Sequence, residues 1–341
     1  DLTVSAGTGA ITFTGAVGGT AALDALALNS TGTTTLTAAV TAGSLATNAG
    51  GTTAINGGAV TTTGAQTYND NVTLGANTAL SATTTTFNGT VAGGGFNLGL
   101  TGNAVFGDAT TDTVTGLGTL AVSGTTTINT ATVTSAGTQT YNGAVTLGAD
   151  TTLTTTDSTV LFSSTVDSTG GARDLTVSAG TGAITFTGAV GQVARLGDVT
   201  ITSANNVTIS AAFSATTLAQ LAGTGTTTVN GITDTNAVGG ISLTGNVQIV
   251  NANLTTTTGG PVTFTNAGLL TLNANVISDG AVTQNGAGAV AITGSRTITT
   301  TSDTVDFLRA VTLNGAGATM VINTTTAGTG GSITFQNTLN A

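Results

Sequence analysis

Cysteine, histidine, lysine, glutamate and tryptophan are all absent from this chain of 341 residues. Without cysteine the chain can form no disulfide bond, and thiols give no indication of its redox compartment. Enzymes take most of their general bases and nucleophiles from His, Cys and Lys, so only Asp, Ser, Tyr and Arg remain for catalysis. We therefore expect no enzyme, no catalytic residue, no cofactor and no metal site.

Charged side chains are also scarce. They make up 5% of the residues, as 14 Asp and four Arg, and give a net charge of −10. Binding to nucleic acid or to an anionic membrane surface depends on Lys and Arg, so neither partner is expected. No run of about 18 apolar residues occurs, so we expect no membrane insertion. The sequence opens at Asp1 within a strand-like pattern, as expected of a mature or internal segment.

Threonine and glycine dominate what is present. The chain has 86 Thr, 51 Gly and one Pro, and 39% of its residues are hydrophobic. Thr, Val and Ile favour strands because their branched side chains are restricted in helices. Apolar residues alternate with Thr at a period of two, which predicts strands with Thr on the outer face. Residues 20–29, TAALDALALN, have a helix-favouring composition, but their relatives at 117–124 and 196–203 contain Gly and β-branched residues, so a strand is predicted there too.

The sequence repeats itself at two levels. The eighteen residues DLTVSAGTGAITFTGAVG at 1–18 recur unchanged at 174–191. Weaker matches extend this repeat into two long copies, 1–173 and 174–341, in one continuous rod without a true linker. Within the first copy, residues 51–77 realign with 124–150, an offset of 73. Fixed-period self-similarity is typical of repeat architectures.

Short strand-like runs at regular intervals predict a parallel β-helix, that is, a β-solenoid. Hairpin signals between long strands are rare, and the runs suit the sides of coils of about 20–25 residues. Coils stack about 4.8 Å apart, so equivalent side chains lie over one another. Stacked charges would repel, whereas stacked Thr and Asn can form hydrogen bonds along the ladder. The predicted fold class is an all-β, elongated solenoid built from duplicated modules.

The recurrent VTLGAD, ITFTGAV, GTTTIN and TQTYN elements resemble the repeat regions of very large bacterial exoproteins of the filamentous-haemagglutinin-like class. The resemblance covers essentially the whole chain and rests on the style of the repeat. It implies a right-handed parallel β-helix shaft that is secreted across a Gram-negative outer membrane through a partner pore. It also implies a role in adhesion or matrix building, outside the cell or on its surface.

The densest charge cluster is Asp303, Asp306 and Arg309. Some β-helix enzymes cut polysaccharides with carboxylates and Arg, but a solvated turn with local charge balance is the favoured interpretation. Asp108 and Asp112, which flank a Thr-rich turn, are interpreted in the same way. No calcium-binding repeat, EF-hand or phosphate-binding loop is present.

Tyr68 and Tyr141 each lie in a QTYN element. A sugar-binding platform would use exposed aromatic rings, whereas repetition of one element favours packing between coils at one structural position. We therefore predict a packing role for both tyrosines.

The expected function is a structural or adhesive shaft of an extracellular fibre or biofilm matrix. Its partners would be copies of itself or neighbouring repeats, and glycans or cell surfaces. One alternative is ice binding, suggested by TTTT at 83–86 and 255–258. A regular ice-binding face needs Thr-x-Thr on one side of every coil, whereas here the offset drifts from 173 to 177 and Thr occurs at every phase. A polysaccharide-acting β-helix enzyme is the third hypothesis.

Overall fold

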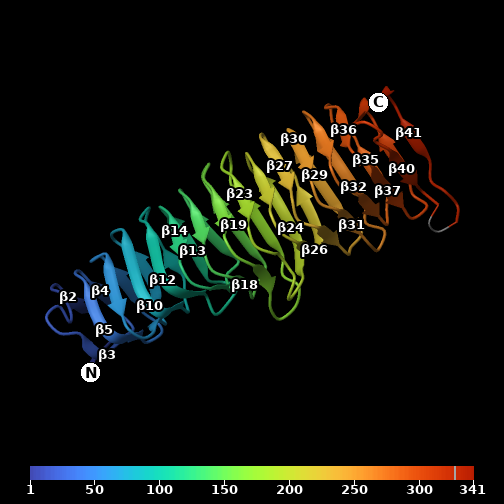
Figure 1. Cartoon of the computed structure of the whole chain (residues 1–341). Coiled ribbons are helices and arrows are strands. Elements are labelled where there is room, and N and C mark those ends of the chain that lie inside the picture. The colour runs from blue at the N-terminus through green and yellow to red at the C-terminus, as the bar shows by residue number, and fades with distance from the viewer. Residues whose placement is uncertain (326–327) are drawn as a thin grey trace. The chain divides into compact units, whose positions relative to one another are not determined.

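The computed structural model describes residues 1–325 and 328–341. Within these residues there is no helix, and 42 strands of two to ten residues make up the fold. The strand pairs are parallel, and paired residues are between 18 and 28 positions apart in sequence. The chain is thus a parallel β-solenoid of about 15 turns, as predicted (Figure 1). Residues 20–29 follow the prediction too, because strand β3 (Leu23–Ser30) occupies them.

By its internal contacts the chain divides into two compact units, Asp1–Ser164 (unit 1) and Thr165–Ala341 (unit 2). That the chain consists of two duplicated copies, residues 1–173 and 174–341, stays a prediction from the sequence. Each unit is described separately below.

Each coil contains three short strands separated by corners, and the strands of successive coils form three stacks. In unit 1 these are stacks A, B and C. Four long strands bend, so that the first half of each lies in stack A and the second half lies in stack B. Stack A contains the first halves of β3, β5 (Val40–Thr47), β10 (Thr78–Phe87) and β12 (Leu98–Phe106), with β7 (Ala59–Thr62), β14 (Leu120–Val122), β17 (Gln139–Tyr141) and β20 (Val160–Phe162). Stack B contains β1 (Leu2–Gly7), the second halves of β3, β5, β10 and β12, and β8 (Gln66–Tyr68), β15 (Thr126–Ile128) and β18 (Val145–Leu147). Stack C contains β2 (Ile11–Phe13), β4 (Thr33–Leu36), β6 (Thr52–Ile55), β9 (Asn71–Leu74), β11 (Val91–Ala92), β13 (Thr113–Leu117), β16 (Thr132–Ser135) and β19 (Thr151–Thr155).

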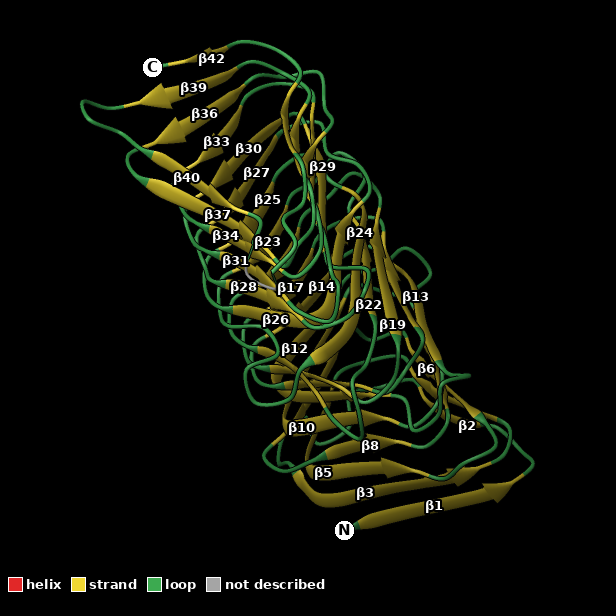
Figure 2. Ribbon diagram, turned by 90° about the vertical axis from the view of Figure 1, so that its right-hand side faces the viewer, coloured by secondary structure: helices red, strands yellow, loops and turns green. Residues whose placement is uncertain are grey.

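Unit 2 is built in the same way from stacks D, E and F (Figure 2). Stack D contains β21 (Val166–Ser168), the first half of β26 (Phe213–Gln220), β28 (Thr233–Thr235), β31 (Leu254–Thr256), β34 (Val276–Ser278), β37 (Arg296–Thr300) and β40 (Met320–Asn323). Stack E contains β22 (Leu175–Ser178), β24 (Leu196–Ser203), the second half of β26, β29 (Ile241–Gly245), β32 (Val262–Asn266), β35 (Val282–Gln284), β38 (Val305–Phe307) and β41 (Ile333–Phe335). Stack F contains β23 (Ile184–Phe186), β25 (Val207–Ile209), β27 (Thr226–Val229), β30 (Val247–Val250), β33 (Leu270–Leu272), β36 (Val290–Thr293), β39 (Val311–Asn314) and β42 (Leu339–Asn340).

The interior consists of ladders of apolar side chains. In stack A one such ladder joins five successive coils, and each of its side chains is at most 3% exposed. Its members are Val40, Val60, Leu80, Leu100 and Val122. Burying one Val or Leu side chain contributes about 1.5–3 kcal/mol, so each coil stabilises its neighbour through a few such contacts.

Threonine also enters the interior, which corrects the expectation that it lies outside. Thr34 and Thr53 are fully buried in stack C. In β4 (TTTL) and β6 (TTAI) alternation places Thr34 on the same side as Leu36, and Thr53 on the same side as Ile55. The period of two therefore fixes which side a residue takes, and Thr occupies both sides.

Asp70 is a buried carboxylate at the corner between β8 and β9. The residue is 1% exposed. Its Oδ1 accepts a hydrogen bond from the Gly51 N–H at 2.8 Å, and its Oδ2 accepts one from the Thr53 hydroxyl at 3.1 Å. Burial raises the pKa of Asp70, and the hydrogen bonds from Gly51, Thr53 and Thr47 offset part of that rise.

We expect Asp70 to make the chain less stable as the pH rises. Because its folded pKa is raised, the folded state holds the proton more tightly than the unfolded state. Its stabilising effect is complete below the unfolded pKa of about 3.9 and is lost as the pH rises through the folded pKa. The slope for one proton is at most about 1.4 kcal/mol per pH unit.

Urea unfolding of the full chain at a series of pH values checks this expectation. Asp70→Asn keeps one acceptor for Gly51 and can donate to the Thr53 hydroxyl, so it should remove this slope. The exposed Asp24→Asn is the matched control and should leave the slope in place. Equal slopes in the two variants would show that Asp70 does not cause the pH dependence.

Candidate functional site

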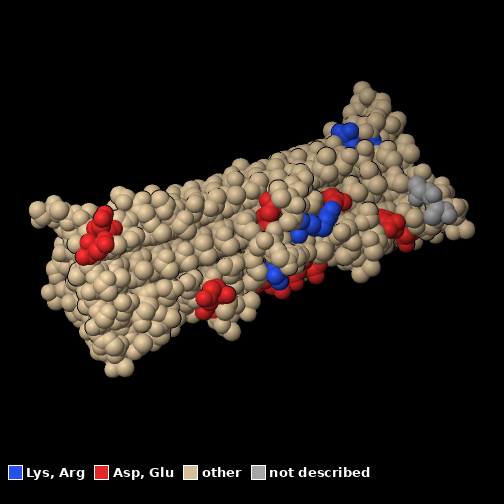
Figure 3. Space-filling view, turned by 90° about the horizontal axis from the view of Figure 1, so that it is seen from below, with Lys and Arg blue, Asp and Glu red and all other residues tan. Residues whose placement is uncertain are grey.

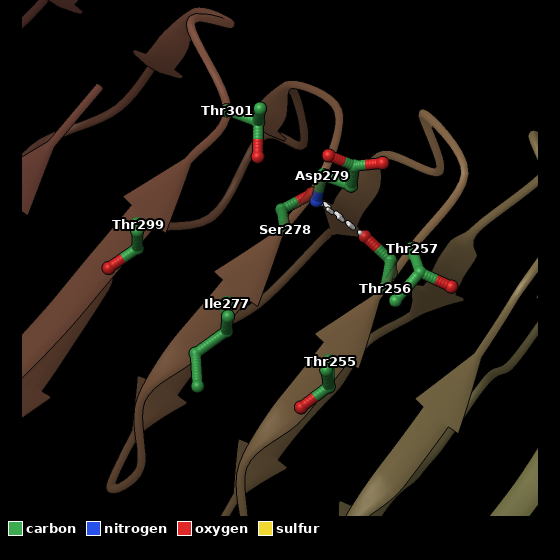
Figure 4. A pocket seen from close by; sticks show the side chains of 8 residues that line it. All are labelled: Thr255, Thr256, Thr257, Ile277, Ser278, Asp279, Thr299 and Thr301. Atoms are coloured by element: carbon green, nitrogen blue, oxygen red, sulfur yellow. Dashed lines mark hydrogen bonds between the residues drawn. The ribbon is translucent and has the colours of Figure 1, made fainter. Parts of the chain in front are cut away.

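An open groove of about 370 Å³ lies on stack D of unit 2 and is here called the Asp279 groove (Figure 4). It is lined by Thr255, Thr256, Thr257, Ile277, Ser278, Asp279, Thr299 and Thr301. Three adjacent strands, β31, β34 and β37, supply these residues. The groove therefore follows directly from the stacking of similar strands.

Register places the lining side chains in two short rows. Thr255, Ile277 and Thr299 are paired residues on the three strands and form the first row. Asp279 and Thr301 follow the ends of their strands and belong to the second row. Ile277 is 43% exposed, so an apolar side chain lies between two hydroxyl groups.

The Asp279 carboxylate is held by the turn beside it. Its Oδ2 accepts a hydrogen bond from the Gly259 N–H at 2.7 Å, and its own N–H donates to the Thr256 hydroxyl oxygen at 3.0 Å (Figure 4). Hydrogen bonds from the Gly259 N–H and the Thr301 side chain hold the pKa of Asp279 below its usual value. The groove thus offers hydroxyl groups and one ionised carboxylate, which suits weak hydrogen bonding to a hydroxyl-rich ligand.

Two further open grooves lie elsewhere on the described surface. One, of about 210 Å³, is lined mostly by Gly, Ala and Thr of unit 2, among them Gly245, Thr265 and Gly286. The other, of about 390 Å³, lies on unit 1 beside β13, β16 and β19 and includes Gly116, Thr134 and Thr154. Neither contains a carboxylate, and in the described part of the chain no group of three His, Cys, Asp or Glu could hold a metal ion.

The structure does not pair the charges at 303–309 with one another. Asp306 lies in β38, and its carboxylate accepts hydrogen bonds from the Gln336 amide at 2.8 and 3.0 Å. Arg309 donates from Nε to the Gly286 carbonyl at 3.3 Å. Asp306 was expected to lie in a charge-balanced turn. That expectation is wrong, because Asp306 occupies the outward position of strand β38.

Asp108 and Asp112 do belong to one turn. The Asp112 Oδ2 accepts hydrogen bonds from the N–H groups of Asp108 and Ala109, at 3.2 and 3.0 Å. This is a side chain closing its own turn, as Asp commonly does. The geometry agrees with the structural role predicted for this pair.

Tyr68 and Tyr141 are fully buried, which confirms their predicted role in packing. Tyr68 stacks on Phe87 with ring centres 5.3 Å apart, and Tyr141 stacks on Phe162 at 5.4 Å. Burial raises the pKa of both phenols, and each hydroxyl donates to the Gln two residues earlier. The prediction of one shared structural position is wrong, because Tyr68 lies in stack B and Tyr141 in stack A.

The ion pair between Arg195 and Asp234 was not anticipated. Both side chains of this salt bridge are 31% exposed. The Arg195 guanidinium also donates to the carbonyls of Ala215 and Asp234, at 2.8 and 3.1 Å. Since the partners are 39 residues apart, no local pattern in the sequence could have identified the pair.

Comparisons with protein-family models, curated proteins and solved structures found no match to this chain. What the structure supports of the filamentous-haemagglutinin-like resemblance is the parallel β-solenoid. No helix among the described residues is long and apolar enough to cross a membrane.

Proposed function

We propose that this chain is a structural and adhesive shaft segment of a secreted bacterial extracellular fibre or matrix protein. It gives the fibre length and stiffness, and it makes surface contact through many weak hydrogen bonds. Its location is outside a Gram-negative cell or on its surface. It performs no catalysis.

The observation that carries this proposal is the placement of the internal repeat of unit 1. Residues 51–57 supply β6 in stack C, whereas their relatives at 124–130 supply β15 in stack B. Likewise the QTY segment at 66–68 forms β8 in stack B, whereas the QTY segment at 139–141 forms β17 in stack A. The second copy of the module therefore lies one stack away from the first.

This displacement favours a shaft over a localised site. A catalytic or binding site needs its residues on one fixed face, and copying a module onto another face would separate them. A shaft needs only that each strand cover the strand of the previous coil, and any stack meets that need. The module has been copied without regard to face, as growth in length requires.

The surface supports the same proposal. On the face drawn in Figure 3 charged side chains are few, and most of that face is uncharged. The grooves are open and lined mainly by Thr, Ser, Gly and Ala. Such contacts are weak one at a time and add up when many repeats engage together.

A coil deletion in the cells that produce the protein tests this proposal. Thr126 pairs with Val145, so deleting residues 126–144 removes one coil and places β18 where β15 was. We expect intact cells carrying this allele to bind antibody against the chain and to attach to surfaces nearly as well as the parent. Deleting all of 1–341 should reduce attachment severalfold.

Two results would contradict the proposal. Antibody labelling only after the cells are permeabilised would place the chain inside them. Loss of attachment by the coil deletion to the same extent as the full deletion, with the shortened protein still displayed, would indicate a local site in that coil.

A further inference from the structure

The outward positions of stack C in unit 1 form two parallel rows, here called the threonine array. The first row has one position per coil in seven coils: Thr33, Thr52, Asn71, Thr90, Thr113, Thr132 and Thr152. The second row has eight positions, each two residues further along its strand: Thr12, Thr35, Ala54, Thr73, Ala92, Thr115, Thr134 and Thr154. Six positions in each row are Thr, so twelve of the fifteen carry both a hydroxyl and a methyl group.

The array is exposed or half-buried throughout, and no charged residue belongs to it. Within the described part of the chain, the hydroxyl groups of Thr35, Thr73 and Thr154 have no hydrogen-bond partner. The hydroxyl oxygens of Thr90 and Thr134 accept backbone N–H groups of the next or previous coil, at 3.3 and 3.0 Å. Most of the hydroxyls are therefore free to bind something outside the chain.

The array has a two-dimensional period. Successive strands are about 4.8 Å apart, and residues two apart on one strand are about 6.6 Å apart. The labelled strands β2, β6, β13 and β19 lie on one side of unit 1 in Figure 2. Parallel register keeps the hydroxyls of successive coils above one another, except that a register shift between β13 and β16 after Val114 interrupts the second row between Thr115 and Thr134.

Variation in coil length leaves the first row in register, contrary to the expectation from the sequence. Val72 and Val91 are 19 residues apart, whereas Val91 and Val114 are 23 apart. The longer coil places its extra residues in the turn that Asp108 and Asp112 close. The extra residues of this coil therefore lie in a corner, and the outward Thr residues stay aligned except between Thr115 and Thr134, where the register shifts.

We propose that the threonine array binds the surface of ice. Ice presents water oxygens on a two-dimensional lattice with periods of a few ångströms, and the array presents hydroxyls and methyls with periods of the same order. A mineral surface would call for carboxylates, and a single sugar chain for exposed aromatic rings; the array has neither. This binding does not depend on the shaft proposal, since it concerns one face of unit 1.

The experiment uses the full chain and measures its partition into slowly growing ice, together with inhibition of ice recrystallisation. Thr73→Tyr and Thr115→Tyr each place a bulky ring in the array. Thr127→Tyr is the matched control, because Thr127 lies in an outward position of β15 in stack B. Urea unfolding of all three variants verifies that each is folded.

We expect the parent chain and Thr127→Tyr to partition into ice, and the two array variants to lose at least tenfold of that partition. Exclusion of the parent chain from ice would overturn the proposal. So would equal loss in all three folded variants, or ice binding that persists in the array variants while their self-association changes. Cell attachment above freezing is independent of these outcomes, so failure here leaves the shaft proposal to its own test.

Discussion

Replacing Phe87 by Ala should lower the free energy of unfolding by about 3–5 kcal/mol, the range for removing a buried aromatic ring. Phe87 is fully buried in stack B, between Tyr68 of the previous coil and Phe106 of the next. The ring centres are 5.3 and 5.7 Å from that of Phe87, and all three rings are nearly parallel. Truncation therefore opens a cavity and removes the stacking partner of both neighbours at once.

The same substitution at Phe96 is the matched control. Phe96 lies in unit 1 in the loop between β11 and β12 and is only half-buried. Phe96→Ala should cost much less, because its site can collapse or admit water. Urea unfolding can be followed by the near-ultraviolet circular dichroism of the two tyrosines, which both belong to unit 1. Equal losses at positions 87 and 96 would argue against the ring ladder as the source of stability.

The strands could be predicted from the sequence because alternation is local, whereas the expectation that Thr lies on the outer side failed at inner positions such as Thr34 and Thr53. LDALALNS at 23–30 forms a strand in which Leu26 and Leu28 are buried, as its β-branched relatives indicated. Tyr68 and Tyr141 could be assigned to packing because the QTYN element that contains them recurs. These predictions use the pattern of short segments and of their repeats, and none of them requires knowing which coils lie together.

The stack to which each strand belongs could not be predicted in the same way. It depends on how many residues each corner contains, and the offset of 73 between modules is not a whole number of coils. Sequence repetition therefore suggested one position for Tyr68 and Tyr141, whereas register places them in different stacks. The threonine array and the Arg195–Asp234 pair escaped prediction for the same reason, since both join residues from different coils.

Replacing Gly102 by Ala should lower the free energy of unfolding by about 2–6 kcal/mol. Gly102 has a φ of +105°, which L residues rarely adopt, and a Cβ there would lie 1.9 Å from the carbonyl oxygen of Ala82. Strained backbone accounts for about 1–3 kcal/mol, and overpacking against a neighbouring strand for about 1–3 kcal/mol more. The contact falls where the register between β10 and β12 shifts, between Ser81 and Thr84, so the backbone of one coil passes close to that of the next.

Gly95 separates the two causes. It also has a positive φ, +87°, but a Cβ there would meet no atom within 4 Å. Gly95→Ala should therefore lose only the part of the free energy of unfolding that comes from backbone strain. The difference in this free energy between the two variants then measures the cost of the close approach of the coils.

Hydrogen exchange on the full chain should show lost protection in β10 and β12 for Gly102→Ala and little change for Gly95→Ala. If the two variants lose the same stability, the approach of β12 to Ala82 does not limit the spacing of the coils. A larger loss at Gly102 would mean that this spacing leaves no room for a methyl group, and that the glycine is required by the stacking rather than by the turn alone.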